Sequence, residues 1–203
     1  MKNNFTAEER RKKALLEFRD LLAGAAFPLM LMLIFGSTIL WFSTSTEDFA
    51  IKILILVVGE VLLIGAYVIF GRHNGIAAMR KSVQNVKKIE TGSEDVKARL
   101  RVGEYALYKG FLIGFISCVP YILVQIIYSA APNVVCEILL KYAFGWAYYP
   151  LSLVQVSDWL NLLWVIPLCC IHCAAYVLGA MIEKKKLNKI AEAQEIKGKY
   201  NKK

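Results

Sequence analysis

Four long blocks of apolar residues, separated by polar and charged segments, dominate the pattern along this chain. The blocks occupy residues 21–43, 53–71, 110–131 and 159–182. Each has about the 20 apolar residues that a helix needs to cross a hydrocarbon core of roughly 30 Å. The second block contains Glu60, the fourth contains His172, and the other two contain no acidic or basic side chain. The pattern therefore predicts an all-α integral membrane protein with four transmembrane helices in two antiparallel hairpins.

The segments beside the blocks carry helical patterns of their own. In residues 1–20, an amphipathic segment, Thr6 precedes Glu9 by three positions. In this capping-box spacing the two side chains satisfy free backbone N–H groups at a helix start, so a helix is predicted to begin near Ala7. Residues 72–109 show apolar positions spaced by three and four on both sides of a Thr-Gly-Ser turn. This segment is predicted to form a helical hairpin that extends the second and third spans beyond the bilayer.

The segment 132–158 is apolar enough to suggest a fifth span, but its charges argue against one. Glu137 and Lys141 lie within it at a helical spacing of four. A fifth span would also place the lysine-rich tail, residues 183–203, on the opposite side of the membrane. An interfacial or re-entrant helix at roughly 134–144 is therefore predicted. The aromatic residues nearby are expected to form part of an outer aromatic belt: Tyr142, Phe144, Trp146, Tyr148, Tyr149 and Trp159.

The distribution of charge predicts the orientation. The chain has 25 Lys and Arg, 16 Asp and Glu, and a formal net charge of +9. All basic residues except Lys52 and Lys141 lie in residues 1–20, 72–109 and 183–203. By the positive-inside rule, both termini and the central segment are predicted to be cytoplasmic in a cell membrane, with 44–52 and 132–158 external. The basic segments should attract anionic lipid headgroups. No nucleic-acid-binding motif accompanies the charge, so nucleic acid is not an expected partner.

Polar residues within the predicted spans suggest a site. Glu60 and His172 lie near the middle of their spans, where an ionisable group is costly and normally has a partner. Their pairing is the simplest hypothesis. Gly110 and Gly114 have the spacing that lets another helix approach closely. Further polar side chains on the same helical faces are predicted to line a binding site or pore: Tyr67, Ser117, Tyr121, Gln125 and Tyr176. The alternative is a hydrogen-bond network between helices that carries no solute.

Cys169, His172 and Cys173 lie on one face of the fourth predicted helix, at positions i, i+3 and i+4. Soft ligands of this kind suit Zn(II) or Cu(I). Structural zinc sites, however, usually take spaced pairs of ligands from separate elements. Free cysteine is also a small, easily buried residue. The pattern therefore favours packing over a metal, haem or thiol redox centre, and no cofactor is expected.

These features predict a small channel or transporter, or a subunit of one, that passes a small solute or ion through a midplane polar site. Because four spans enclose little volume, a homo-oligomer or a larger membrane complex is expected. One alternative is a non-transporting adaptor or regulatory subunit that docks a partner through its cytoplasmic helices. Another is a thiol- or metal-dependent membrane enzyme. No nucleotide-binding glycine loop, zinc-protease motif or hydrolase motif is present, so the sequence does not favour an enzymatic function.

Overall fold

The computed structural model describes residues 6–91, 105–148 and 159–200, and within these ranges every regular element is a helix. The helices are α1 (Ala7–Thr44), α2 (Phe49–Glu90), α4 (Leu107–Ala130), α5 (Val134–Ala143) and α7 (Val165–Tyr200), with a 3-10 helix, η1 (Leu160–Trp164), before α7. Four of them are long and apolar enough to cross a membrane: α1, α2, α4, and η1 continued by α7. The prediction of an all-α chain with four helices of membrane-spanning length is confirmed.

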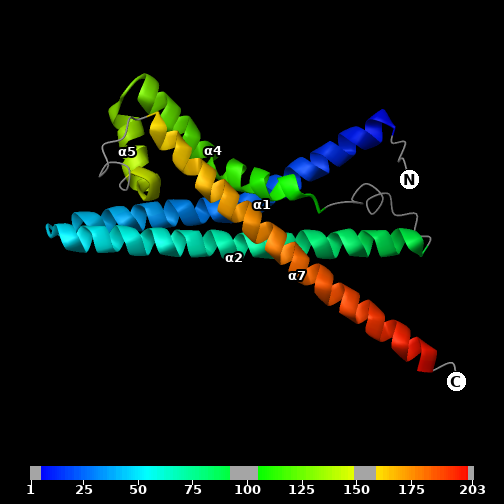
Figure 1. Ribbon diagram of the computed structural model, residues 1–203. Coiled ribbons are helices and arrows are strands. Elements are labelled where there is room, and N and C mark those ends of the chain that lie inside the picture. The colour runs from blue at the N-terminus through cyan, green and yellow to red at the C-terminus, as the bar shows by residue number, and fades with distance from the viewer. Residues whose placement is uncertain (1–5, 92–104, 149–158, 201–203) are drawn as a thin grey trace.

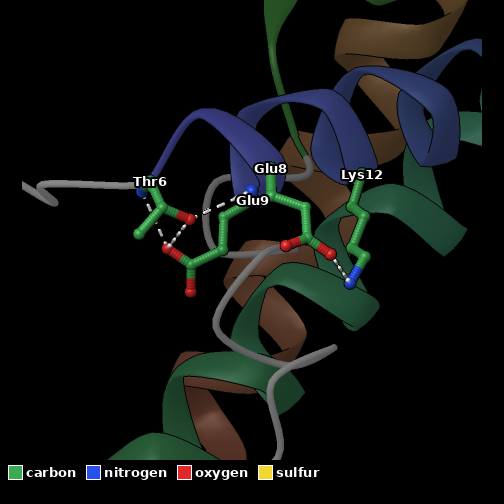
Figure 2. Close-up of polar contacts among 4 residues, drawn as sticks. All are labelled: Thr6, Glu8, Glu9 and Lys12. Carbon is green, nitrogen blue, oxygen red and sulfur yellow. Dashed lines mark hydrogen bonds and ion pairs between the residues drawn. The ribbon is translucent and has the colours of Figure 1, made fainter.

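Helix α1 begins at the predicted capping box (Figure 2). The backbone N–H of Glu9 donates to the Thr6 hydroxyl at 3.3 Å, and the backbone N–H of Thr6 donates to the Glu9 carboxylate at 2.9 Å. In the same turn, the Lys12 ammonium lies 2.6 Å from the Glu8 carboxylate. The hydrogen bond and charge of Lys12 lower the pKa of Glu8 below its ordinary value, and Glu8 raises the pKa of Lys12. The predicted start near Ala7 is confirmed, and α1 continues unbroken into the first apolar block.

Helix α2 is far longer than the second apolar block. It begins after Asp48, whose side chain accepts hydrogen bonds from the backbone N–H groups of Ala50 and Ile51. Its 42 residues correspond to roughly 63 Å at 1.5 Å per residue, about twice the thickness of a hydrocarbon core. The first arm of the predicted central hairpin is thus a direct continuation of α2. The turn and most of the second arm fall at 92–104, outside the described residues.

The helices form a crossed arrangement (Figure 1). Helices α1 and α2 run side by side in opposite directions, since Phe27 stacks on Phe70 with ring centroids 4.9 Å apart and Ile39 contacts Gly59. Helix α7 crosses α2 near its middle and packs along α4 with its first half. The first turn of α1 and the last turn of α7 lie at one side of the bundle, together with the Glu90 end of α2. We call this the termini side, and the opposite side the loop side.

Helix α5 folds back over α1 and α4 at the loop side, and a short helical segment, 145–148, follows it. The ring of Tyr121 contacts the rings of Phe144 and Trp146, with centroids 5.6 and 5.3 Å away. All three residues are fully or almost fully buried. The prediction that Phe144 and Trp146 form part of an outer aromatic belt is therefore wrong, because the fold-back turns them toward the core. Of the other predicted belt residues, Tyr142 and Trp159 are exposed, Tyr148 is half-buried, and Tyr149 lies outside the described residues.

Candidate functional site

Small residues bring α2 and α7 into close contact and so set the geometry of the bundle centre. A Cβ atom added at Gly71 would lie 2.8 Å from a backbone carbonyl oxygen of α7, and one at Gly75 would overlap the carbonyl group of Tyr176. From the other side, a Cβ atom at Gly179 would overlap the carbonyl oxygen of Arg72. Residues without side chains at these points let the two backbones touch, as is common where membrane helices cross.

Helix α4 meets α7 through the glycine pair that the sequence singled out. A Cβ atom at Gly110 would lie 2.9 Å from the ring of Tyr176, and one at Gly114 would lie 3.1 Å from the Cα atom of Cys169. The close approach predicted from this spacing is confirmed. The same spacing of small residues occurs at the crossing of α2 and α7, in Gly71 and Gly75 of α2 and in Ala175 and Gly179 of α7, and sequence reasoning missed it there. Those pairs were the visible signal for the tightest helix contact of the fold.

His172 lies fully buried where α7 passes both α2 and α4. Its Nδ1 atom is 2.8 Å from the carbonyl oxygen of Gly110, and its ring contacts the ring of Tyr67 edge to face, with centroids 5.9 Å apart. A carbonyl oxygen can only accept, so this bond assigns the proton to Nδ1. The buried Nε2 atom has no hydrogen-bond partner. In the neutral ring, Nε2 is therefore a free acceptor inside the bundle.

Tyr67 joins α2 to α4 through a short chain of hydrogen bonds. The Ser117 hydroxyl donates to the carbonyl oxygen of Gly114 at 2.7 Å. Since that bond uses the serine hydrogen, the Tyr67 hydroxyl is the donor in its own 2.8 Å contact with Ser117. Both side chains are fully buried. Tyr67, Ser117 and His172 are thus three predicted site residues that the structure brings together.

Glu60 does not join this group. Its two carboxylate oxygens are buried and have no hydrogen-bond partner. Along α2, Glu60 precedes Tyr67 by about 10 Å and precedes Gly71, where α7 crosses, by about 16 Å. The hypothesis of a Glu60–His172 pair is therefore wrong. The reason is that α7 crosses α2 on the termini side of Glu60 and does not run beside the half of α2 that carries Glu60 (Figure 1).

The other predicted site residues are distributed along the bundle. On the loop side, the hydroxyl of Tyr121 donates to the carbonyl oxygen of Asn161 at 3.0 Å. Gln125 is buried one turn further along α4. Toward the termini side, Tyr176 stacks on Tyr105 with ring centroids 5.6 Å apart. The predicted set therefore follows the length of α4 and does not collect in one chamber.

The cysteine group of the fourth span is part of the helix packing. Cys169 is buried against Gly114, Cys170 is exposed, and the Cys173 thiol lies 3.7 Å from the carbonyl oxygen of Leu107. All five cysteines of the chain lie in the described ranges and are free thiols. Within those ranges, no group of three or more His, Cys, Asp or Glu side chains is placed to hold a metal ion.

The helices define the class of protein: an α-helical membrane protein with four apolar helices of membrane-spanning length. No protein-family model, curated protein or solved structure matches the chain. The assignment of a more specific function therefore depends on the side chains described above.

Proposed function

We propose that this protein passes a small ion or solute across the cell membrane, alone or as a subunit of a larger machine, with Glu60 as its polar centre. The observation that carries the proposal is the pair of buried carboxylate oxygens without partners on an apolar helix. A carboxylate within a span is expensive and normally binds a proton, a cation, water or a basic group. A proton or a small cation is the cargo that suits it best.

Unsatisfied polar groups in the packed cluster that adjoins this face of α2 support the same proposal. Its neighbours on the helix face, Leu56 and Leu63, belong to the packed cluster that also contacts Trp146 and Trp164. The indole N–H groups of both tryptophans are buried without hydrogen-bond partners. Unsatisfied donors and acceptors in one core favour occupation by water or a polar solute.

The position of Glu60 also supports an oligomer or a complex. Tyr67 and Tyr121 are fully buried in the bundle, whereas Glu60 is only half-buried, at the edge of the packed core. A second copy or another membrane subunit packed against this edge would enclose a path beside the carboxylate. We therefore include a homo-oligomer or a larger membrane complex in the proposal.

The proposed orientation places both termini in the cytoplasm and residues 44–52 and 132–158 outside. The proposed topology is two antiparallel hairpins, α1 with α2 and α4 with α7, with α5 as an interfacial or re-entrant helix. The start of α1 and the end of α7 lie on the same side of the bundle, which supports this arrangement (Figure 1). The basic residues of the termini side would then contact anionic lipid headgroups.

Reconstitution into liposomes tests the proposal. Purified protein would be inserted into vesicles that contain a pH-sensitive dye, and proton and potassium flux would be recorded under a set gradient. We expect flux with the wild type and with Glu47→Gln, a control at an exposed acid outside the apolar block. Glu60→Gln should abolish the flux, and Glu60→Asp should retain part of it. Folded wild-type protein without flux above empty vesicles contradicts conduction by this chain and favours the second candidate.

The second candidate is a non-transporting adaptor that docks a partner through its helical extensions. Helices α2 and α7 continue to Glu90 and Tyr200, well past the apolar blocks. The Arg80 side chain donates to the carboxylate of Glu183 at 3.0 Å and joins the two extensions, and Glu183 is 5% exposed. A fixed pair of extensions suits docking. Photo-crosslinking from Ile190, an exposed apolar residue of α7, should capture a discrete partner if this function holds. An enzymatic role has no observation in its favour among the described residues.

A further inference from the structure

A cavity of about 240 Å³ opens between α1, α2, α4 and α7 on the termini side. It lies where the apolar blocks give way to charged segments, the level at which lipid headgroups meet a membrane protein. Its lining combines small and apolar residues with five charged or amide side chains. These five are Glu17 and Asp20 of α1, Asn74 and Lys81 of α2, and Lys109 of α4.

Lys109 distinguishes this cavity from an ordinary surface groove. The residue is 8% exposed, although lysine is rarely buried to this extent. Its ammonium lies 3.6 Å from the carboxylate of Glu17, beyond the 2.7–3.2 Å typical of an N–H···O hydrogen bond. A buried charge is stable only when paired and hydrogen-bonded. The ammonium has three N–H donors, so a bound ligand could accept from it inside the cavity.

The charges of the lining are balanced, and the acidic and basic walls meet at the Glu17–Lys109 ion pair. The two carboxylates come from α1, and the two ammonium groups come from α2 and α4. A simple anion would be attracted by one wall and repelled by the other, and so would a simple cation. A zwitterion can satisfy both walls together. Because carboxylates gain most from N–H donors, a primary ammonium fits the acidic wall better than a quaternary one.

We propose that this cavity binds a phosphoethanolamine group, with its phosphate toward Lys81 and Lys109 and its ammonium toward Glu17 and Asp20. A volume of about 240 Å³ suits a headgroup and excludes a whole lipid. The group could be the headgroup of a membrane lipid or a free phosphate ester. The site is separate from Glu60, and the proposal does not depend on ion flux.

Binding to the purified full-length protein in detergent tests the proposal. The probes are short-chain phosphatidylethanolamine, phosphatidylcholine and phosphatidylglycerol with identical acyl chains, together with free phosphoethanolamine, each measured by calorimetric titration. Phosphatidylethanolamine should bind at least ten times more tightly than the other two lipids. Competition by free phosphoethanolamine supports a soluble ligand, and its absence supports a lipid headgroup. Equal or tighter binding of phosphatidylcholine or phosphatidylglycerol, or no binding of either ethanolamine probe, overturns the proposal.

Two variants test the location of the site. Lys109→Gln combined with Glu17→Gln removes one charge from each wall and keeps the balance, and Ala77→Phe fills the cavity without changing its charge. Each should weaken binding of phosphatidylethanolamine at least tenfold. The matched controls, Lys185→Gln and Ala174→Phe at exposed positions of α7, should leave it unchanged. If the charge variant does not fold, Ala77→Phe decides alone, and full affinity in that variant overturns the proposed location.

Discussion

The crossing of α2 and α7 makes a sharp prediction about two glycines of the same helix. A Cβ atom at Gly75 would overlap the carbonyl oxygen of Tyr176 and lie 2.8 Å from the attached carbon, whereas ordinary contacts begin near 3.4 Å. The obstructing atoms belong to backbone and cannot rotate away. A Cβ atom at Gly65 would meet no atom within 4 Å. Gly75→Ala must therefore push the helices apart, and Gly65→Ala fills open space.

The magnitudes follow from these distances. Overpacking a tight contact typically costs about 1–3 kcal/mol. Replacing glycine by alanine within a helix stabilises it by roughly 0.5–1 kcal/mol. Gly65→Ala should therefore be neutral or slightly stabilising, and Gly75→Ala should lower the free energy of unfolding. The two variants should differ by about 2 kcal/mol.

Reversible unfolding in mixed micelles of a mild detergent and sodium dodecyl sulfate measures this difference, with circular dichroism as the signal. Gly179→Ala, which meets the backbone of Arg72, should be as harmful as Gly75→Ala. The double variant should cost less than the sum, since one separation of the helices accommodates both methyl groups. If Gly75→Ala is as stable as Gly65→Ala, α2 and α7 do not meet at this crossing.

Three further outcomes are expected. Glu60→Gln and His172→Gln should change the free energy of unfolding additively, within about 0.5 kcal/mol, because the two residues are far apart and share no partner. A larger coupling energy would restore the hypothesis that Glu60 and His172 pair. Tyr67→Phe should cost about 0.6 kcal/mol and at most about 1.7, the range measured for hydrogen bonds between membrane helices, and no loss would exclude that bond. Lys12→Ala should raise the pKa of Glu8 in an NMR titration, because Lys12 lowers it. This carboxylate's contribution to stability is present above its unfolded pKa and is lost as pH falls through its lowered folded pKa, and an unchanged Glu8 pKa would rule out the ion pair.

Features set by local sequence were predictable. The four apolar blocks are long enough for spans, so the helices followed from composition alone. The capping box at Thr6 needs only two residues three positions apart, and it formed as expected. The short helix after Asn133, now α5, was visible from its charges and helical spacing. Each of these depends on interactions within one helix or with the surrounding solvent.

Features set by contacts between helices were predictable only in part. The glycine spacing at Gly110 and Gly114 indicated a close approach, but not which helix would come near. Phe144 and Trp146 are aromatic residues of the kind that an interfacial belt contains. Only the fold-back of α5 over α1 and α4 turns their side chains inward. Burial at the loop side therefore depends on a tertiary contact for which the sequence carries no periodic signal.

The failure of the Glu60–His172 pair has a geometric origin. Counting residues from the ends of an apolar block gives a depth, and two residues of equal depth are neighbours only if their helices run side by side. Membrane helices tilt, and their tilt is set by packing. Here Gly71 and Gly75 fix the crossing of α2 and α7 on the termini side of Glu60. Helices that cross and then diverge separate residues that a depth count places together. The glycine pairs of a membrane chain should therefore locate the crossing before any ionisable residues are paired across it.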